Sequence, residues 1–121
     1  MVLVAVDDLL FSSKIRATAK GAGVEVTFAR SPSEILEGAR ALAPSLVIFD
    51  LNSGKTDPIA TIAAMKRDPA LAGIRAIGFV SHVDTPAIQA ARAAGADEIM
   101  ARSTFAGDLA GILLAERTTR P

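Results

Sequence analysis

Three aspartates follow two short apolar runs of the chain. Asp7 and Asp8 come directly after residues 2–6, and Asp50 comes directly after residues 46–49. If the two runs are neighbouring parallel strands, the three carboxylates converge at one edge of a sheet. Like charges held that close repel strongly in a protein environment. Such a cluster is expected to bind a divalent cation, to be neutralised by a basic side chain, or to keep one acid protonated.

These acids are suited to metal-assisted phosphoryl chemistry. Oxygen ligands with room for water suit Mg²⁺, and the ion would bring a phosphoryl donor close to Asp50, which can act as a nucleophile. A simpler alternative is that acids at strand ends cap the helices that follow. That alternative stays open for Asp8 in particular. Helix capping accounts less well for all three acids together, because all three are aspartates and all three stand at the ends of the two expected strands.

Apolar runs alternate along the chain with longer segments of helical period, and these elements must position the acids. Uninterrupted apolar runs are typical of parallel strands that are covered on both faces. Five strands are predicted, at residues 2–6, 24–28, 46–49, 74–80 and 98–101. Their alternation with helices predicts an α/β fold: a flavodoxin-like, doubly wound, five-stranded parallel sheet. The common strand order is 2-1-3-4-5, which places a ligand crevice at the ends of strands one and three.

Capping residues mark the expected helix boundaries. Proline directly follows a capping residue at three helix starts, which are Ser31-Pro32, Asp57-Pro58 and Thr85-Pro86. Ser31 is also followed three residues later by Glu34, which completes a capping box. Gly23 and Gly95 are placed to close the first and fourth helices in a left-handed conformation. A fifth helix is predicted over residues 105–116.

Length and composition limit the classes of function. The chain has 121 residues, the size of one domain, so residues 1–121 are predicted to form a single domain. Its 13 basic and 13 acidic residues leave no net charge, which disfavours binding to nucleic acid or to an anionic membrane. Cysteine is absent, and no apolar run reaches the length of a membrane helix. We therefore expect a soluble, cytoplasmic protein.

Four segments of the chain resemble one known family. The segments VLVAVDDLL, LVIFDLN, AIGFVS and GADEIMAR, in this order and spacing, are similar to the receiver domains of bacterial two-component response regulators. The similarity spans essentially the whole chain. It implies that Asp50 accepts phosphate from a sensor histidine kinase or a phosphotransfer protein. It also implies that Asp7, Asp8, Asp50 and the backbone carbonyl of Asn52 hold Mg²⁺.

The resemblance assigns two further residues to the phosphoryl group. Ser81 stands at the hydroxyl position that ends strand four, and Arg102 stands where the family has its lysine. Three interpretations of Arg102 are open: it clamps Asp50 and Asp7 and so competes with Mg²⁺, it is a tolerated exchange of cations, or it points into solvent. Ser103 replaces the proline that follows the lysine in the family, so no cis peptide bond is expected there.

Three other departures from the family pattern lie near the expected pocket. His82 stands where the family has a small side chain, and we expect it to narrow access to Asp50, with an exposed, inert imidazole as the alternative. Ile99 occupies the position of the switch aromatic, so the usual side-chain signal on strand five is missing. The loop after Asp50 reads LNSGKTDP and lacks the family's Met-Pro and Asp-Gly pattern. The simplest role of Asp57 in this loop is to cap a helix.

The leading hypothesis is a stand-alone receiver that switches its affinity for a protein partner. Only residues 116–121 follow the fifth predicted helix, so we expect no output domain unless the chain is a fragment of a longer protein. By resemblance, the kinase docks on the first helix near Leu10, Ser12 and Ile15. A downstream protein would bind the face formed by the fourth helix, fifth strand and fifth helix, and the aliphatic side of that face could also support a homodimer.

Two other hypotheses come from different classes. A degenerate receiver would act as a phosphorylation-independent protein-interaction module, as the four departures at positions 82, 99, 102 and 103 favour. An enzyme or flavin carrier on the same fold is disfavoured. Residues 7–13, DDLLFSS, do not form a phosphate-binding loop for a flavin, and Asn52 stands where phospho-aspartate hydrolases carry a second acid.

Overall fold

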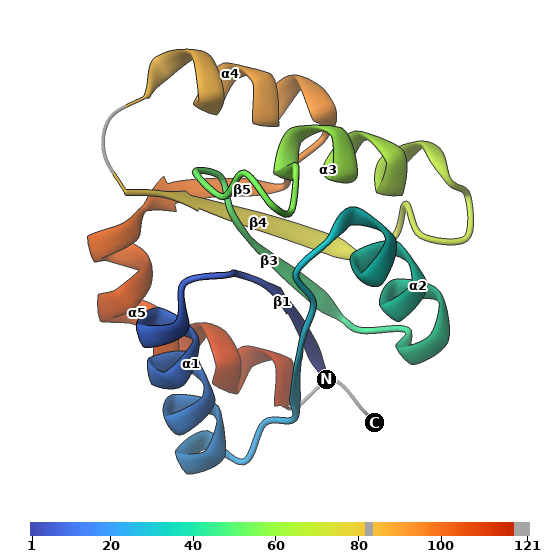
Figure 1. The fold of residues 1–121 in the computed structure, drawn as a ribbon. Coiled ribbons are helices and arrows are strands. Elements are labelled where there is room, and N and C mark those ends of the chain that lie inside the picture. The colour runs from blue at the N-terminus through green and yellow to red at the C-terminus, as the bar shows by residue number, and fades with distance from the viewer. Residues whose placement is uncertain (82–83, 118–121) are drawn as a thin grey trace.

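Five parallel strands form one sheet, and each strand is followed by a helix (Figure 1). The computed structural model describes residues 1–81 and 84–117. The strands are β1 (Val2–Ala5), β2 (Val26–Phe28), β3 (Leu46–Asp50), β4 (Arg75–Val80) and β5 (Glu98–Ala101). Their order across the sheet is β2-β1-β3-β4-β5, and every neighbouring pair is parallel. The predicted fold class and strand order are confirmed.

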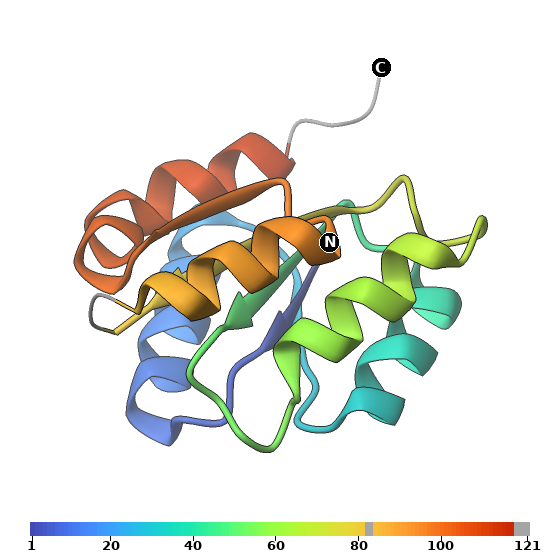
Figure 2. The same cartoon turned by 90° about the horizontal axis from the view of Figure 1, so that it is seen from above.

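The helices cover both faces of this sheet. They are α1 (Leu9–Ala22), α2 (Pro32–Leu42), α3 (Pro58–Arg67), α4 (Thr85–Ala94) and α5 (Arg102–Arg117). Helices α1 and α5 pack on one face, and α2, α3 and α4 pack on the other. Figure 2 shows the same layers from above. The three central strands are buried between the layers, which explains why they are apolar at consecutive positions.

Successive residues of each central strand contribute to the two cores in turn, because side chains alternate across a sheet. In β1, Val4 packs toward α1 and α5, whereas Leu3 packs toward α2 and α3. The core under α1 and α5 also contains three aromatic rings whose centroids lie between 4.8 and 5.8 Å apart, those of Phe11, Phe79 and Phe105. This ring cluster connects α1, β4 and α5 within that core.

The helix starts agree in part with the capping predictions. Ser31 caps α2 as predicted, because its Oγ accepts a hydrogen bond from the N–H of Glu34 at 3.2 Å. The prediction for α4 is wrong by one residue: the cap is Asp84 and not Thr85. The Oδ1 atom of Asp84 accepts the N–H of Ala87 at 3.1 Å. Thr85 is instead the first residue of the helix, and proline follows it within the first turn.

The starts of α3 and α5 also differ from the predictions. Asp57 occupies the N-cap position of α3 with a left-handed φ of 44°, but its side chain makes no capping hydrogen bond, so its predicted capping role is wrong. The hydroxyl of Thr61 donates instead to the carbonyl of Asp57 at 2.8 Å. Helix α5 begins at Arg102 and not at residue 105. Gly23 and Gly95 close α1 and α4 in left-handed conformations, as predicted.

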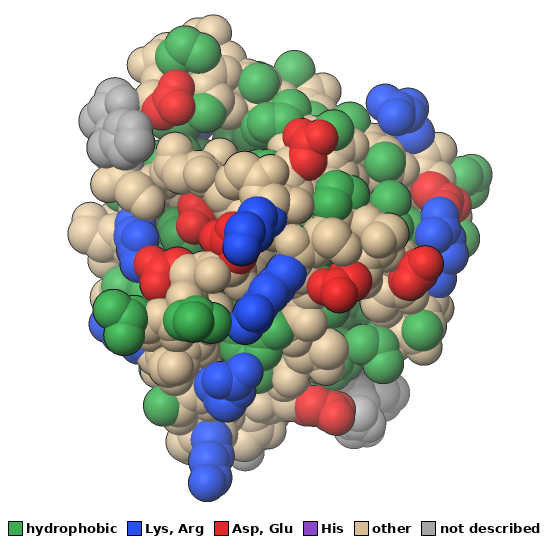
Figure 3. Space-filling view, viewed as in Figure 1, with side chains coloured by type: hydrophobic (Ala, Val, Ile, Leu, Met, Phe, Trp, Pro, Cys, Tyr) green, Lys and Arg blue, Asp and Glu red, His purple; other side chains and the backbone are tan. Residues whose placement is uncertain are grey.

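The surface carries both signs of charge. Acidic and basic side chains are interspersed on the face shown in Figure 3. This mixture is consistent with the equal numbers of basic and acidic residues, 13 of each. Within the part of the chain that the structure describes, no helix combines the length and the apolar character needed to cross a membrane.

Candidate functional site

The crevice at the carboxyl ends of β1 and β3 is built around Asp50. This residue ends β3 and is buried, with 6% of its surface exposed. Its Oδ1 accepts a hydrogen bond from the N–H of Asn52 at 2.9 Å. No described residue donates to Oδ2, and Oδ2 is not one of the buried unpaired atoms within residues 1–81 and 84–117. Oδ2 is therefore the carboxylate oxygen that remains accessible from the crevice.

The charges around Asp50 act on it in opposite directions. Burial has the largest effect and raises the pKa of the Asp50 carboxyl above its ordinary value of 3.8. The N–H of Asn52 and the positive charge of Arg102 lower this pKa, whereas the negative charges of Asp7 and Asp8 raise it further. The two acids after β1 and the cation after β5 are thus close enough to influence the acid that ends β3.

Asp8 has two roles in the structure. Its Oδ1 caps α1 by accepting the N–H groups of Leu10 at 3.0 Å and Phe11 at 3.1 Å. Its Oδ2 forms an ion pair with Nη2 of Arg102 at 3.0 Å. The N–H of Phe11 and then Arg102 hold the pKa of the Asp8 carboxyl below its usual value. The helix-capping alternative therefore holds for one oxygen of Asp8, while the other faces the crevice.

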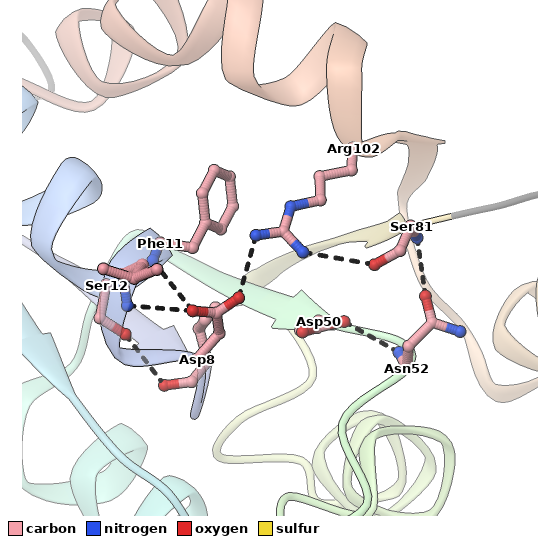
Figure 4. A network of polar contacts seen from close by, with 9 residues as sticks. Asp8, Phe11, Ser12, Asp50, Asn52, Ser81 and Arg102 are labelled. Carbon is pink, nitrogen blue, oxygen red and sulfur yellow. Dashed lines mark hydrogen bonds and ion pairs between the residues drawn. The ribbon is translucent and has the colours of Figure 1, made fainter.

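Arg102 reaches across the crevice from the first turn of α5. Figure 4 shows its guanidinium between Asp8 and Ser81, with Asp50 nearby. Besides the ion pair with Asp8, Nη1 lies 3.5 Å from Oγ of Ser81, and Cζ lies 4.3 Å from the centroid of the Phe11 ring. The arginine does not point into solvent, so that interpretation is wrong. Its ion-pair partner is Asp8 and not the predicted Asp50 and Asp7.

Asn52 contributes a contact that the sequence did not lead us to expect. Its side-chain Oδ1 accepts the backbone N–H of Ser81 at 2.7 Å and so ties the loop after β3 to the end of β4. The strand register explains this contact: Asp50 pairs with Phe79, and two residues further along both strands bring Asn52 opposite Ser81. The role predicted for Asn52 in the metal site involved only its backbone carbonyl.

The oxygen donors in the crevice are of the kind that Mg²⁺ prefers, but they are partly engaged. Among the described residues, no group of three or more acidic or histidine side chains is arranged to hold a metal ion. Both oxygens of Asp8 have partners, and one of them is Arg102. Asp7 is half-buried and makes no hydrogen bond or ion pair with a described residue. A cation that takes Asp8 as a ligand must therefore displace or share the arginine.

Two predicted residues do not join this cluster. His82 lies outside the described residues. Ile99 is half-buried on β5, where it packs at the margin of the core under α4 and lines a cavity of about 310 Å³.

The predicted kinase-docking residues on α1 differ in how exposed they are. Leu10 is 86% exposed, but Ser12 and Ile15 are buried, because they lie on the face of α1 that packs on the sheet, so assigning these two to an exposed surface is wrong.

Comparisons with known proteins give a likeness in structure only. No protein-family model matches the sequence, and no curated protein sequence matches it. A response regulator from Hahella chejuensis superposes with a TM-score of 0.84 at 18% identity, covering 98% of this chain and 95% of that protein. The phosphorylated cyanobacterial phytochrome response regulator RcpA superposes with a TM-score of 0.79 at 21% identity, covering 99% and 95%.

The Mn²⁺-bound form of response regulator Rcp1 is a third similar structure, with a TM-score of 0.73 at 17% identity over 98% of this chain and 91% of that protein. At identities this low, the likeness shows the fold. The chain therefore has the fold of response-regulator receiver domains, over nearly its whole length.

Proposed function

We propose that residues 1–121 form a receiver domain of two-component signalling that accepts a phosphoryl group on Asp50 and thereby changes its affinity for a protein partner. One observation carries this proposal. Asp50 ends the central strand β3 as a buried carboxylate with an accessible Oδ2, and it lies within the electrostatic reach of two other acids and one cation. An acid in that setting is disposed to react and not merely to cap a helix.

The chemistry assigned to Asp50 is a single displacement at phosphorus. A bond forms between Oδ2 and phosphorus. The bond from phosphorus to the leaving atom, which is the histidine nitrogen of a phosphohistidine or the carboxylate oxygen of an acyl phosphate, breaks with its electron pair leaving on that atom. Asn52 holds Oδ1 through its N–H and so leaves Oδ2 as the attacking atom. Ser81 and Arg102 lie at the opening of the crevice, where they can donate hydrogen bonds to phosphoryl oxygens.

The proposed metal ligands are Asp7, Asp8, Asp50 and the backbone carbonyl of Asn52. A bound Mg²⁺ would neutralise charge on these acids and on the incoming phosphoryl oxygens. The similar structure with Mn²⁺ bound supports a divalent ion in this fold. In this chain, the ion pair between Arg102 and Asp8 opposes metal binding, so we propose that the arginine must move when the ion binds.

The proposed function requires two kinds of protein partner, one that donates the phosphoryl group and one that receives the output. A sensor histidine kinase or a phosphotransfer protein would supply the phosphoryl group, approaching the crevice beside the exposed Leu9 and Leu10. The output would pass through the face formed by α4, β5 and α5 to a downstream protein or to a second copy of this chain. This is a binding role and not an enzymatic one.

The test is phosphorylation by a small donor. The protein is incubated with acetyl phosphate and Mg²⁺, and intact mass and peptide mapping locate any phosphoryl adduct. We expect one adduct on Asp50, none in the Asp50→Asn variant, and a normal adduct in Asp57→Asn, which removes an exposed acid of the same loop. An adduct that persists in Asp50→Asn, or none in the native chain at millimolar donor, contradicts the proposal.

A second candidate function rests on Arg102. Because the arginine already satisfies Asp8 and contacts Ser81, the crevice can be stable without a metal or phosphoryl group. The domain would then be a degenerate receiver that binds its partner without phosphorylation. In that case, partner binding is the same in the native chain and in Asp50→Asn.

A further inference from the structure

A cavity of about 310 Å³ lies between α4 and β5 and adjoins the crevice at Asp50, because Ser81 and Arg102 line both. The end of β4, one side of α4, the edge strand β5 and the start of α5 form its walls. Figure 2 shows α4 running alongside β5, with α5 behind it. A cavity of this volume falls at the lower end of the range that binds small organic molecules.

The inner walls of the cavity are apolar. Ile88 of α4 and Ile99 of β5 line the cavity and are half-buried at the margin of the core under α4. These two side chains offer a surface that is only partly covered by the rest of the described chain. The cavity therefore favours a ligand with an apolar body, and an aromatic ring supplies a large apolar area in a compact group.

The polar groups at the cavity are donors and cations. Arg92 and Arg102 both line it, together with the hydroxyls of Ser81 and Ser103, and no acidic residue is among its described lining residues. Arg102 is already paired with Asp8. Arg92 is exposed and forms no ion pair with any residue in the described ranges, so its charge is available to a ligand. This arrangement complements an anion.

We propose that this cavity binds a small aromatic carboxylate, with its ring between Ile88 and Ile99 and its carboxylate at Arg92. The proposal uses neither Asp50 nor a metal, so it can be tested without phosphoryl transfer, although Ser81 and Arg102 line both the cavity and the crevice. An arginine beside an apolar wall selects a carboxylate with an apolar body over a neutral compound of the same shape, because the guanidinium forms charge-assisted hydrogen bonds with a carboxylate.

The probe for the test is 2-naphthoate, and 2-naphthalenemethanol is its neutral analogue. Each compound is titrated into the ¹⁵N-labelled protein without Mg²⁺ or phosphoryl donor, and amide shifts are followed. We expect saturable shifts at residues 88, 92 and 99–100, with naphthoate binding about tenfold more tightly than the alcohol. Absence of saturable shifts at millimolar naphthoate overturns the proposal, and so does equal binding of the two compounds.

Substitutions at Arg92 and in the apolar wall sharpen this test. Arg92→Gln is expected to weaken naphthoate binding about tenfold and to remove the preference over the alcohol. Arg30→Gln, which removes an exposed arginine beside the opposite edge strand β2, is the matched control and is expected to bind normally. Ile99→Phe should fill the cavity and weaken both compounds, and Ile88→Phe serves if that variant does not fold. Equal binding by Arg92→Gln and Arg30→Gln contradicts the assignment of Arg92.

Under the proposed function, the face that holds this cavity also meets a downstream protein or a second copy of this chain, and the second copy can be tested with the purified protein. If the amides at positions 88 and 99 shift with protein concentration in the absence of ligand, and sedimentation shows a dimer over the same range, another copy covers the cavity. That result would overturn the proposal of a small-molecule site. Concentration-independent spectra of a monomer, with the naphthoate shifts described above, support it.

Discussion

Replacing Arg102 with methionine is expected to tighten the binding of Mg²⁺ to the crevice. The arginine forms an ion pair with Asp8 at 3.0 Å and lies with its Cζ 4.3 Å from the centroid of the Phe11 ring. A metal that takes Asp8 as a ligand must break the ion pair and move the guanidinium. Methionine keeps a long side chain for packing but has no charge, so this competition disappears.

The change in Mg²⁺ affinity follows from the two contacts that Arg102 makes, with the Phe11 ring and with Asp8. A guanidinium over an aromatic ring at a partly exposed site contributes roughly 0.5–1 kcal/mol. That energy corresponds to about a two- to fivefold change in an equilibrium constant. Loss of the ion pair with Asp8 acts in the same direction, as does removal of a positive charge from beside a divalent ion. We therefore expect Mg²⁺ to bind Arg102→Met at least about fivefold more tightly than the native chain.

The assay is a Mg²⁺ titration of each protein, followed by the amide shifts of residues 50–53 and checked by calorimetry. Arg75→Met is the matched control, because Arg75 pairs with Glu98 at 2.7 Å at the opposite end of β4. This control loses the same charge and two ion pairs, those with Glu98 and Glu116, but leaves the crevice intact. If Arg102→Met binds Mg²⁺ no more tightly than Arg75→Met, Arg102 does not compete with the metal.

Three other substitutions test the forces that shape the fold and the crevice. Because burial raises the pKa of Asp50, the folded state binds protons there more readily than the unfolded chain. Stability contributed at this site is present below the ordinary pKa of 3.8 and is lost as pH rises through the raised value. Asp50→Asn should therefore be more stable than the native chain to urea at pH 7, with the difference shrinking toward pH 3; an unchanged difference argues against a buried charge. Gly78→Ala places a Cβ 2.9 Å from Cγ of Leu51 and should lower the free energy of unfolding by about 1–3 kcal/mol, less so in a Leu51→Ala background. Ala43→Gly relieves a left-handed φ of 45° at the end of α2 and should raise stability by up to about 1 kcal/mol in the same assay, and a loss of stability would contradict this explanation.

The fold could be predicted because local and global patterns agree. The continuous apolar runs identify the buried parallel strands, and the observed strand bounds differ from the predicted ones by at most two residues at either end. Capping residues predict the first residue of a helix less reliably where two possible capping residues are adjacent in the sequence. Asp84 and Thr85 are both good caps, and proline is tolerated in either of the first two helical positions, so sequence alone cannot choose between them.

The crevice was predictable in its position but not in its contacts. The strand-end positions indicated where Asp7, Asp8 and Asp50 would face one another. The partner of Arg102 depends on where α5 begins, and this helix starts at the arginine itself with no preceding sequence signal. A long side chain can then reach any of several carboxylates, and the ring of Phe11 helps to select Asp8.

Two further features are the burial of Ile15 on α1 and the contact between Asn52 and Ser81 after β3. Ile15 is four residues from both Phe11 and Ala19, which places it on the buried face of α1 and not on a docking surface. The contact between Asn52 and Ser81 follows from the parallel register of β3 and β4, once that register is known. Register is not visible in a single sequence when strands are apolar throughout.

The most direct test of the central claim is the response of the native chain to beryllofluoride, a stable mimic of a phosphoryl group, in the presence of Mg²⁺. Amide shifts are mapped in the native chain and in Asp50→Asn. We expect large shifts at Asp50 and Asn52 that spread to Ser81 and β5 in the native chain and are absent in the variant. No Mg²⁺-dependent shift at millimolar beryllofluoride, or equal shifts in the variant, would contradict Asp50 as the phosphoryl acceptor.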